Sequence, residues 1–222
     1  MGPLFKSTLL ILSALFPIVN PLGSAPLFLS LTRYYSAEQR KMLSWRISMN
    51  SVFLIVGSYF IGTHILAFFG ISIPVVQVGG GLVLVSTGWA MLKQKDEDET
   101  KADVHRTVDT NDLFQKAFYP LTLPLTVGPG SISVAITLGA NEPHQGNRII
   151  YSIIGAIIGS ILIAASVYVC YAFADRLAKV LGATGMSIVM RLSSFLLVCI
   201  GTQIIWNGVS ALLKSLEIAR PG

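Results

Sequence analysis

Charged residues are scarce in this chain of 222 residues. Only 12% of the residues are Asp, Glu, Lys or Arg, whereas 53% are hydrophobic, and the mean hydropathy is +0.68. In a soluble globular domain the charged fraction is usually about a quarter. The composition therefore excludes an ordinary soluble domain and favours a protein embedded in the membrane.

Residues that carry enzyme chemistry are also few. Both cysteines, Cys170 and Cys199, fall in apolar runs, where small buried side chains are expected rather than a disulfide or a metal pair. The sequence has no His-Glu-x-x-His zinc motif, no paired intramembrane aspartates and no Gly-x-Ser-x-Gly elbow. Ser131 follows a Gly-Pro-Gly turn, but no base is placed beside it by the sequence. We therefore expect no enzymatic activity, no metal site and no cofactor.

Long runs without Asp, Glu, Lys or Arg make up most of the chain. A bilayer core of about 30 Å needs about 20 apolar residues in a helix. Most of the runs fit one crossing, and Ile47–Leu92 is long enough for two, with Gly70 and Pro74 at the turn. The six expected transmembrane helices are Leu4–Thr32, Trp45–Phe69, Pro74–Leu92, Phe118–Gly139, Ile149–Phe173 and Ile188–Leu213.

Lysine and arginine are distributed unevenly between the two sides of these helices. The positive-inside rule places the richer side in the cytoplasm and both termini outside. The same bias explains the pI near 9.3 without nucleic-acid binding. Residues 93–116, including the acidic run 96–99, are expected to form a solvated cytoplasmic linker. The basic residues of the expected cytoplasmic side are Arg33, Arg40, Lys41, Arg46, Lys93, Lys95, Lys101, Arg106, Lys116, Arg176 and Lys179.

Two of the expected helices contain clusters of helix breakers. Proline removes a backbone N–H and clashes with the preceding turn, and glycine lets the backbone turn. Each interrupted helix opens one half of the chain and is followed by two further apolar segments. Such a pair is typical of transporters built from inverted repeats. The breakers are Pro17, Asn20, Pro21, Gly23 and Pro26 in the first helix, and Pro120, Pro124, Gly128, Pro129 and Gly130 in the second.

This pairing predicts an all-α membrane protein whose six transmembrane helices form two inverted three-helix repeats, with helices 1 and 4 broken at mid-membrane. Residues 1–92 would form the first repeat, 93–116 the polar linker and 117–222 the second repeat. Three helices per half is an odd number, so the second half must enter the membrane inverted. A weak internal similarity supports this division: Gly70-Ile71-Ser72-Ile73 recurs as Gly185-Met186-Ser187-Ile188.

The two interruptions form the candidate substrate site. An unpaired backbone group is costly in lipid, so a non-helical stretch persists there only if it is buried in protein or lines a wet cavity. Restarted helix N-termini suit a carboxylate, and unwound carbonyls with the Asn20 amide suit an ammonium group or a cation. The alternative is a pair of simple proline kinks. The candidate substrate-binding residues are Asn20, Pro21, Gly23, Ser24, Thr126, Gly128, Pro129, Gly130 and Ser131.

Four other polar residues are weaker candidates for pathway lining or gating, namely Asn50, Gln77, Arg191 and Gln203. The amides could equally bond a neighbouring helix, and Arg191 could extend its side chain to the interface. No Asp or Glu lies inside an expected span, and Asp175 stands at an end. A proton relay based on a buried carboxylate is therefore not expected, while the coupling ion, sodium or a proton, stays open.

The chain resembles the MarC family of integral membrane proteins at several motifs. Asn20-Pro21-Leu22-Gly23, with Pro26 and Phe28 behind it, resembles the first family signature, and the run 120–131 resembles the second. Phe69-Gly70-Ile71-Ser72-Ile73-Pro74 leading into Gly79-Gly80, and Arg191 followed by Leu196-Leu197-Val198, are similar too. Gly81, Ser193 and Ser194 depart from the family pattern, which leaves the packing of the third and sixth helices open.

The resemblance implies a six-helix inner-membrane protein related to the lysine-exporter superfamily, some of whose members transport small neutral amino acids such as alanine and glycine. We therefore expect a secondary transporter of such amino acids, with export as one option, in the cytoplasmic (inner) membrane of a bacterium or archaeon. Its partners would be a zwitterionic substrate and the lipid bilayer, with no nucleic acid, and the oligomeric state stays open. The alternative is a drug or metabolite efflux protein without amino acid specificity. A structural or signalling role would leave the paired interruptions unexplained.

Overall fold

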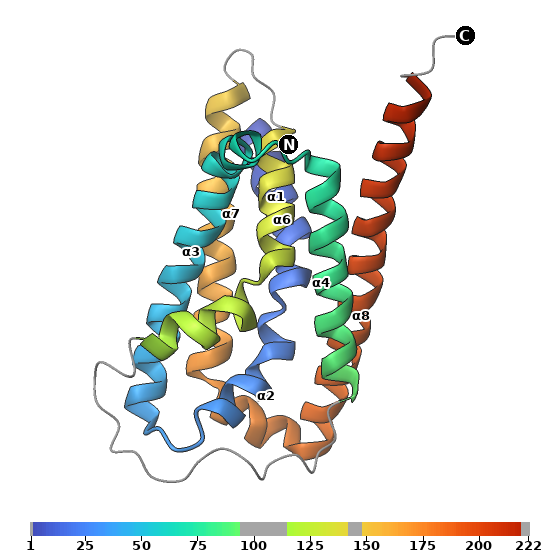
Figure 1. Cartoon of the computed structure of the whole chain (residues 1–222). Helices are drawn as coiled ribbons and strands as arrows, with labels where there is room; N and C mark the ends of the chain where they lie inside the picture. Colours follow the sequence, from blue (N-terminus) through green and yellow to red (C-terminus); the bar gives the residue numbers. More distant parts are fainter. Residues whose placement is uncertain (1, 94–114, 142–147, 219–222) are drawn as a thin grey trace.

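The computed structural model describes residues 2–93, 115–141 and 148–218, and all secondary structure in these residues is helical (Figure 1). The predicted linker 93–116, with its acidic run 96–99, lies almost wholly outside the described residues. The helices are α1 (Pro3–Val19), α2 (Pro21–Leu31), α3 (Ala37–Phe68), α4 (Ile73–Lys93), the π-helix η1 (Ala117–Thr126), α6 (Pro129–Ala140), α7 (Arg148–Ala172) and α8 (Ala174–Ile218).

The helices are long and apolar enough to cross a membrane five times, or six times if the bent pair of η1 and α6 forms one span. This confirms the predicted all-helical membrane protein. Most predicted helix ends agree closely with the structure, as for Ile149–Phe173 against Arg148–Ala172 of α7. The candidate spans besides the bent pair are Pro3–Leu31, Ala37–Phe68, Ile73–Lys93, Ile149–Ala172 and Thr184–Leu216.

Two helices begin earlier than the uncharged runs predicted. α3 starts at Ala37 because Ser36 forms a capping box with Gln39: the Ser36 Oγ accepts the Gln39 N–H at 3.2 Å, and the Gln39 Oε1 accepts the Ser36 N–H at 2.9 Å. α8 starts at Ala174 and turns at Gly182, whose φ of 65° and ψ of 177° favour glycine. The similarity between the halves of the sequence matched Gly70 with Gly185. Gly70 has a positive φ, but in the second half the positive φ falls at Gly182 rather than at Gly185.

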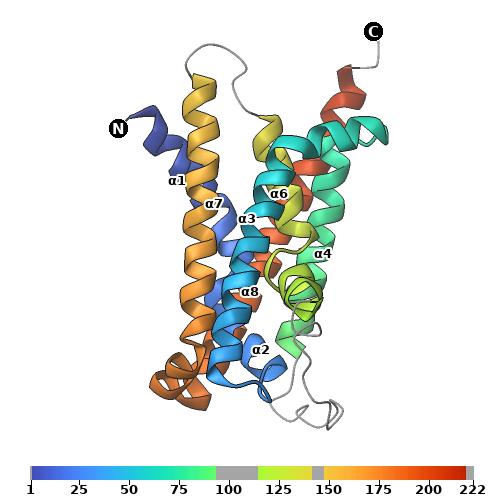
Figure 2. The ribbon, with the colours of Figure 1, turned by 90° about the vertical axis from the view of Figure 1, so that its left-hand side faces the viewer.

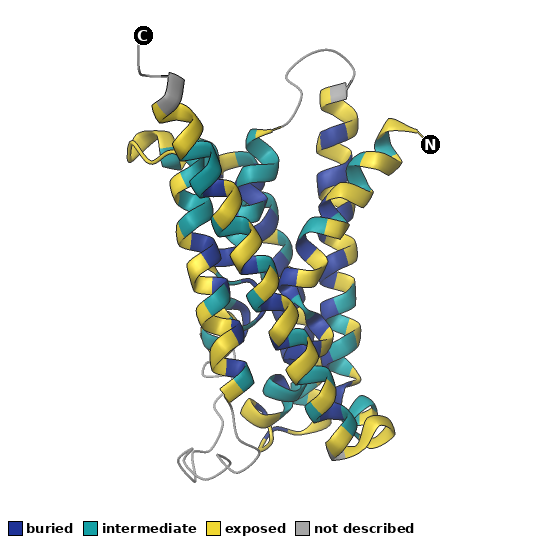
Figure 3. Cartoon of the chain, turned by 90° about the vertical axis from the view of Figure 1, so that its right-hand side faces the viewer, coloured by how far each residue is buried: buried dark blue, intermediate teal, exposed yellow. Residues whose placement is uncertain are grey.

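The bundle has a main core and, packed against it through α2 and α6, an antiparallel pair of helices. α1 packs along α7, and α3 packs against α6 and α7, so that these helices share one buried apolar cluster. α4 packs most extensively against α8 (Figures 1 and 2). Buried residues line the inner faces of the helices and exposed residues lie outside (Figure 3). The start of α1 and the end of α8 lie at one end of the bundle, which fits six crossings if η1 and α6 form one span.

Glycines bring α4 and α8 into backbone contact. A Cβ placed on Gly81 would lie 2.7 Å from the Gly201 carbonyl oxygen, and one on Gly201 would lie 2.8 Å from the Gly81 carbonyl oxygen. A Cβ on Gly88 would lie 2.8 Å from the Ser194 carbonyl oxygen, and one on Gly208 would lie 2.6 Å from the Pro74 carbonyl oxygen. Small residues permit such close helix packing in membranes. We call the contact between α4 and α8 at these four glycines the glycine seam.

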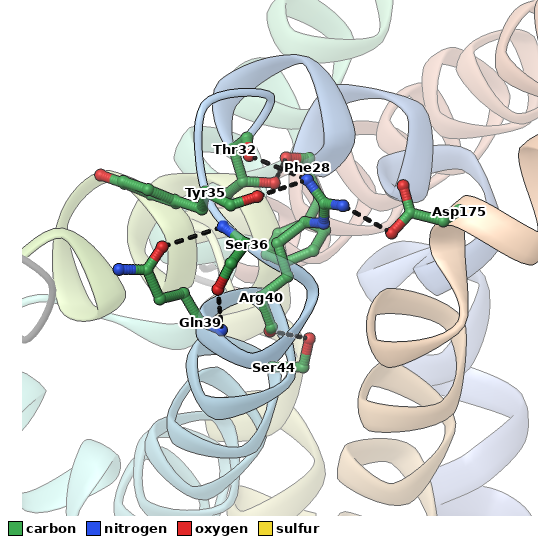
Figure 4. Close-up of polar contacts among 8 residues, drawn as sticks. All are labelled: Phe28, Thr32, Tyr35, Ser36, Gln39, Arg40, Ser44 and Asp175. Atoms are coloured by element: carbon green, nitrogen blue, oxygen red, sulfur yellow. Dashed lines mark hydrogen bonds and ion pairs between the residues drawn. The ribbon is translucent and has the colours of Figure 1, made fainter. Parts of the chain in front are cut away.

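At the opposite end from the termini, Arg40 of α3 joins three segments (Figure 4). Its Nη1 donates to the carbonyl oxygens of Thr32 at 3.3 Å and Tyr35 at 2.8 Å, just after α2 ends. Its Nη2 forms an ion pair with Asp175 Oδ2 at 2.8 Å, in the first turn of α8. The guanidinium therefore fastens the end of α2 to the junction between α7 and α8.

Candidate functional site

The first interruption lies at Asn20, between α1 and α2. Asn20 has a φ of 49° and a ψ of 58°, a left-handed conformation that asparagine tolerates better than most residues. Its Oδ1 accepts the Gly23 N–H at 3.2 Å and so caps the first turn of α2, where Pro21 occupies the first helical position. The motif therefore ends one helix and starts the next at the same residue.

The other side-chain atom of this amide has no partner. Asn20 Nδ2 is buried and makes no hydrogen bond to the described residues. Leaving such a donor unpaired costs about 1–3 kcal/mol. The amide lies directly over Gly23, where a Cβ would overlap it and would also lie 2.5 Å from the Ser193 Cβ of α8. Asn20 thus offers an unused N–H to an acceptor at the interruption.

The second interruption separates η1 from α6, with a bend of 69° between the two helices. Val127 and Gly128 are non-helical, and Pro129 starts α6. In η1, the hydroxyls of Thr122 and Thr126 each donate to a carbonyl oxygen five residues earlier, at 2.6 Å and 2.7 Å. Side-chain hydroxyls thereby satisfy backbone acceptors in a segment whose prolines cannot donate.

The first turn of α6 is packed closely against its neighbours. The Ser131 Oγ donates to the Gly128 carbonyl oxygen at 2.9 Å, across the interruption. Gly130 faces the Leu84 side chain of α4, which a Cβ at position 130 would overlap. The same turn continues to Ser133, whose hydroxyl donates to the Val76 carbonyl oxygen of α4 at 3.0 Å. Any larger residue at Gly130 must therefore displace the Leu84 side chain or move α6 away from α4.

Tyr171 of α7 links the two interruptions, a role that the sequence did not predict. Its hydroxyl lies 3.0 Å from the Thr126 Oγ1 of η1. Its ring stacks on Phe28 of α2, with centroids 4.5 Å apart and the planes 11° from parallel. Tyr171 is only 1% exposed. Phe28 of α2 and the predicted site residue Thr126 of η1 therefore meet at one side chain.

The four weaker candidates lie in different places. The Asn50 Nδ2 of α3 donates to the Thr122 Oγ1 at 3.3 Å, so that Asn50 faces the second interruption. Gln77 packs beside Gly208 in the glycine seam. Gln203 is exposed and donates from Nε2 to the Asn207 Oδ1 at 2.9 Å, on the outer side of α8, and Arg191 is exposed as well. The hydrogen bond from Asn50 places this amide against η1.

The site is polar without being charged. The predicted substrate-binding residues are amide, hydroxyl and backbone groups, and none of them is ionisable. No group of three or more His, Cys, Asp or Glu side chains that could hold a metal ion occurs in the described part of the chain. A groove of about 370 Å³, lined by Glu38, Lys41, Met42, Trp45 and Tyr168, lies on the outside of α3 and α7 and contains no residue of either interruption. The interruptions can therefore offer hydrogen-bond donors and acceptors, together with two helix N-termini.

Comparison with known proteins identifies the family. Residues 5–213 match the family described as MarC family integral membrane protein. The relative named inner membrane protein MarC from Salmonella typhimurium is 32% identical over 220 residues, which cover 97% of this chain and 99% of the relative. The protein of the same name from Escherichia coli (strain UTI89 / UPEC) is 31% identical over 221 residues, with the same coverage. No solved structure matches the chain. The chain belongs to the MarC family of integral membrane proteins.

Proposed function

We propose that this protein is a secondary transporter of small neutral amino acids in the cytoplasmic (inner) membrane, and that the substrate binds between the two interruptions. The observation that carries the proposal is the meeting of the two interruptions at Tyr171, whose ring stacks on Phe28 of α2 and whose hydroxyl contacts Thr126 of η1. Two unrelated proline kinks would not need to face each other. The membership of a family whose relatives are named inner membrane proteins supports the location.

The chemistry of the interruptions favours a zwitterion as the substrate. The unpaired Asn20 Nδ2 suits a carboxylate or carbonyl oxygen, and the N-terminal turns of α2 and α6 carry a partial positive charge that suits the same group. The carbonyl oxygen of the non-helical residue Val127 suits an ammonium group. Because no ionised side chain is present there, a molecule of no net charge is the expected cargo.

The pattern of helix contacts supports two inverted repeats broken within the membrane. α2 lies against α7 and α8, just as α6 lies against α3 and α4. α1 packs on α7, just as η1 packs on α3, while α3 with α7 and α4 with α8 pair directly. An exchange of residues 1–92 with 117–222 therefore preserves the main contacts. With the basic end in the cytoplasm, both termini lie outside.

Counterflow of labelled alanine in proteoliposomes tests the function. We expect saturable exchange that unlabelled glycine or serine competes away, and we expect Asn20→Ala and Gly130→Leu to abolish it. The matched controls are Asn207→Ala, at an exposed amide, and Gly79→Leu, at an exposed glycine whose added side chain meets open space. Both controls should keep exchange within about twofold of the unchanged protein, because they alter neither interruption.

The other outcomes of this assay distinguish the alternatives. Full exchange in both Asn20→Ala and Gly130→Leu would remove the interruptions from the mechanism. Exchange of drugs or metabolites but not of amino acids would instead favour the efflux alternative. Repeating the assay with a sodium or pH gradient identifies the coupling ion. We propose no enzymatic activity, and labelling of Ser131 by a fluorophosphonate probe would contradict this.

A further inference from the structure

We infer that Tyr171 is a positioning residue that holds the two interruptions in one arrangement, so that a change at one is transmitted to the other. The inference rests on the proposed function for its meaning in transport, and on geometry for the coupling itself. α2 and η1 belong to different halves of the chain and make only limited direct contact. The Tyr171 side chain touches both of them, through its ring at Phe28 and through its hydroxyl at Thr126.

The surroundings of the phenol give it this role rather than that of a simple core residue. Core packing needs only the ring, which Phe28 already covers by stacking. The hydroxyl is not needed for such packing. Because burial removes water, it must be hydrogen-bonded within the protein, and Thr126 is its partner. The Thr126 hydroxyl donates its hydrogen to the Leu121 carbonyl oxygen at 2.7 Å, so the Thr126 Oγ1 can accept the hydrogen of the Tyr171 hydroxyl.

The chain offers a close internal comparison for Thr126. Thr122 lies one turn earlier in η1, is equally buried, and donates to the Ala117 carbonyl oxygen at 2.6 Å in the same way. Its other side-chain contact is with Asn50 of α3 rather than with Tyr171. Replacing either threonine by valine removes the same backbone bond, but only Thr126→Val removes the contact with the phenol. Tyr168 provides the corresponding comparison on α7, because its ring packs against Trp45 on the outside.

Hydrogen–deuterium exchange of the purified full-length protein tests the coupling without any substrate. We expect Thr126→Val and Tyr171→Phe to raise amide exchange about fivefold in the first turns of α2, which is the effect of losing about one hydrogen bond on local opening. Thr122→Val and Tyr168→Phe should change it by less than about twofold. Exchange that rises in η1 alone after Thr126→Val, with α2 unchanged, would overturn the inference.

Transport provides the second readout. In the alanine counterflow assay, Tyr171→Phe and Thr126→Val should each raise the half-saturating concentration about fivefold while leaving the maximal rate within about twofold. The effect of the double variant should fall short of the product of the two single effects, because both substitutions remove the contact between Tyr171 and Thr126. Multiplied effects would contradict the inference. If the unchanged protein showed no amino acid counterflow, the proposed function would fail. Hydrogen–deuterium exchange of the α2 amides would still decide whether Tyr171 couples the two interruptions.

Discussion

Replacement of Arg40 by methionine should destabilise the protein more than loss of its ion pair alone. Arg40 is 16% exposed, and it serves the carbonyl oxygens of Thr32 and Tyr35 as well as the Asp175 carboxylate (Figure 4). Methionine keeps much of the apolar stem but removes all three contacts. The end of α2 would then lose its attachment to the first turn of α8.

The magnitude follows from the contacts and their burial. A hydrogen bond from a charged donor contributes about 1.5–3 kcal/mol when it is well buried. The ion pair adds about 0–1 kcal/mol, since Asp175 is 47% exposed and remains hydrated. Water replaces part of the lost bonds at this end of the bundle, so Arg40→Met should lower the free energy of unfolding by about 2–4 kcal/mol. Asp175→Asn should lower it by about 0.5–1 kcal/mol.

Denaturant titration in detergent micelles, followed by tryptophan fluorescence, measures these free energies. Arg40→Lys should fall between the two variants, because an ammonium group cannot serve three acceptors in the fork geometry of a guanidinium. Asp175→Asn in the Arg40→Met background should have little further effect. Equal losses from Arg40→Met and Asp175→Asn would refute the view that the carbonyl contacts dominate.

Three other changes test separate features. Gly201→Val should reduce stability by about 1–3 kcal/mol by forcing α4 and α8 apart, whereas Gly79→Val, which adds a side chain in open space, should be close to neutral in the same titration. Gly182→Ala should cost about 1–3 kcal/mol through its positive φ alone, since a Cβ there meets no other atom, and a lowered melting temperature in detergent would report it. In intact cells, an impermeant maleimide should label Ile71→Cys but not Ser36→Cys, and the reverse pattern would invert the proposed orientation.

The sequence predicted the spans because hydrophobic length is a local property that a bilayer enforces. Uncharged runs cannot reveal helices that carry charge, so the predictions missed the first turns of α3 and the start of α8 from Ala174 to Leu181. For α3 a local signal existed, since Ser36 and Gln39 have the spacing of a capping box. The segment after Ala174 contains Asp175, Arg176 and Lys179, which ended the apolar run although the chain stays helical.

The candidate site was predictable in part, for a similar reason. Asn20 and Gly128 mark interruptions because their neighbouring prolines act on the backbone within a few residues. Tyr171 carries no such mark: an aromatic residue in an apolar run indicates a core position, and only the fold places its hydroxyl between α2 and η1. Likewise, the sequence could not show that Gln203 faces outward, because α8 is apolar around most of its circumference.

The two helices that pack most closely in this protein are not neighbours in the sequence. α4 and α8 come from opposite halves of the chain, yet their backbones touch so closely that neither helix can slide without the other. Gly70 lies before α4, and Gly182 lies within α8 ahead of its part in the glycine seam; both have a positive φ, and a Cβ at either would meet no other atom. We therefore expect any rearrangement to move α4 and α8 together as one rigid body, hinged at these two glycines against the remaining helices.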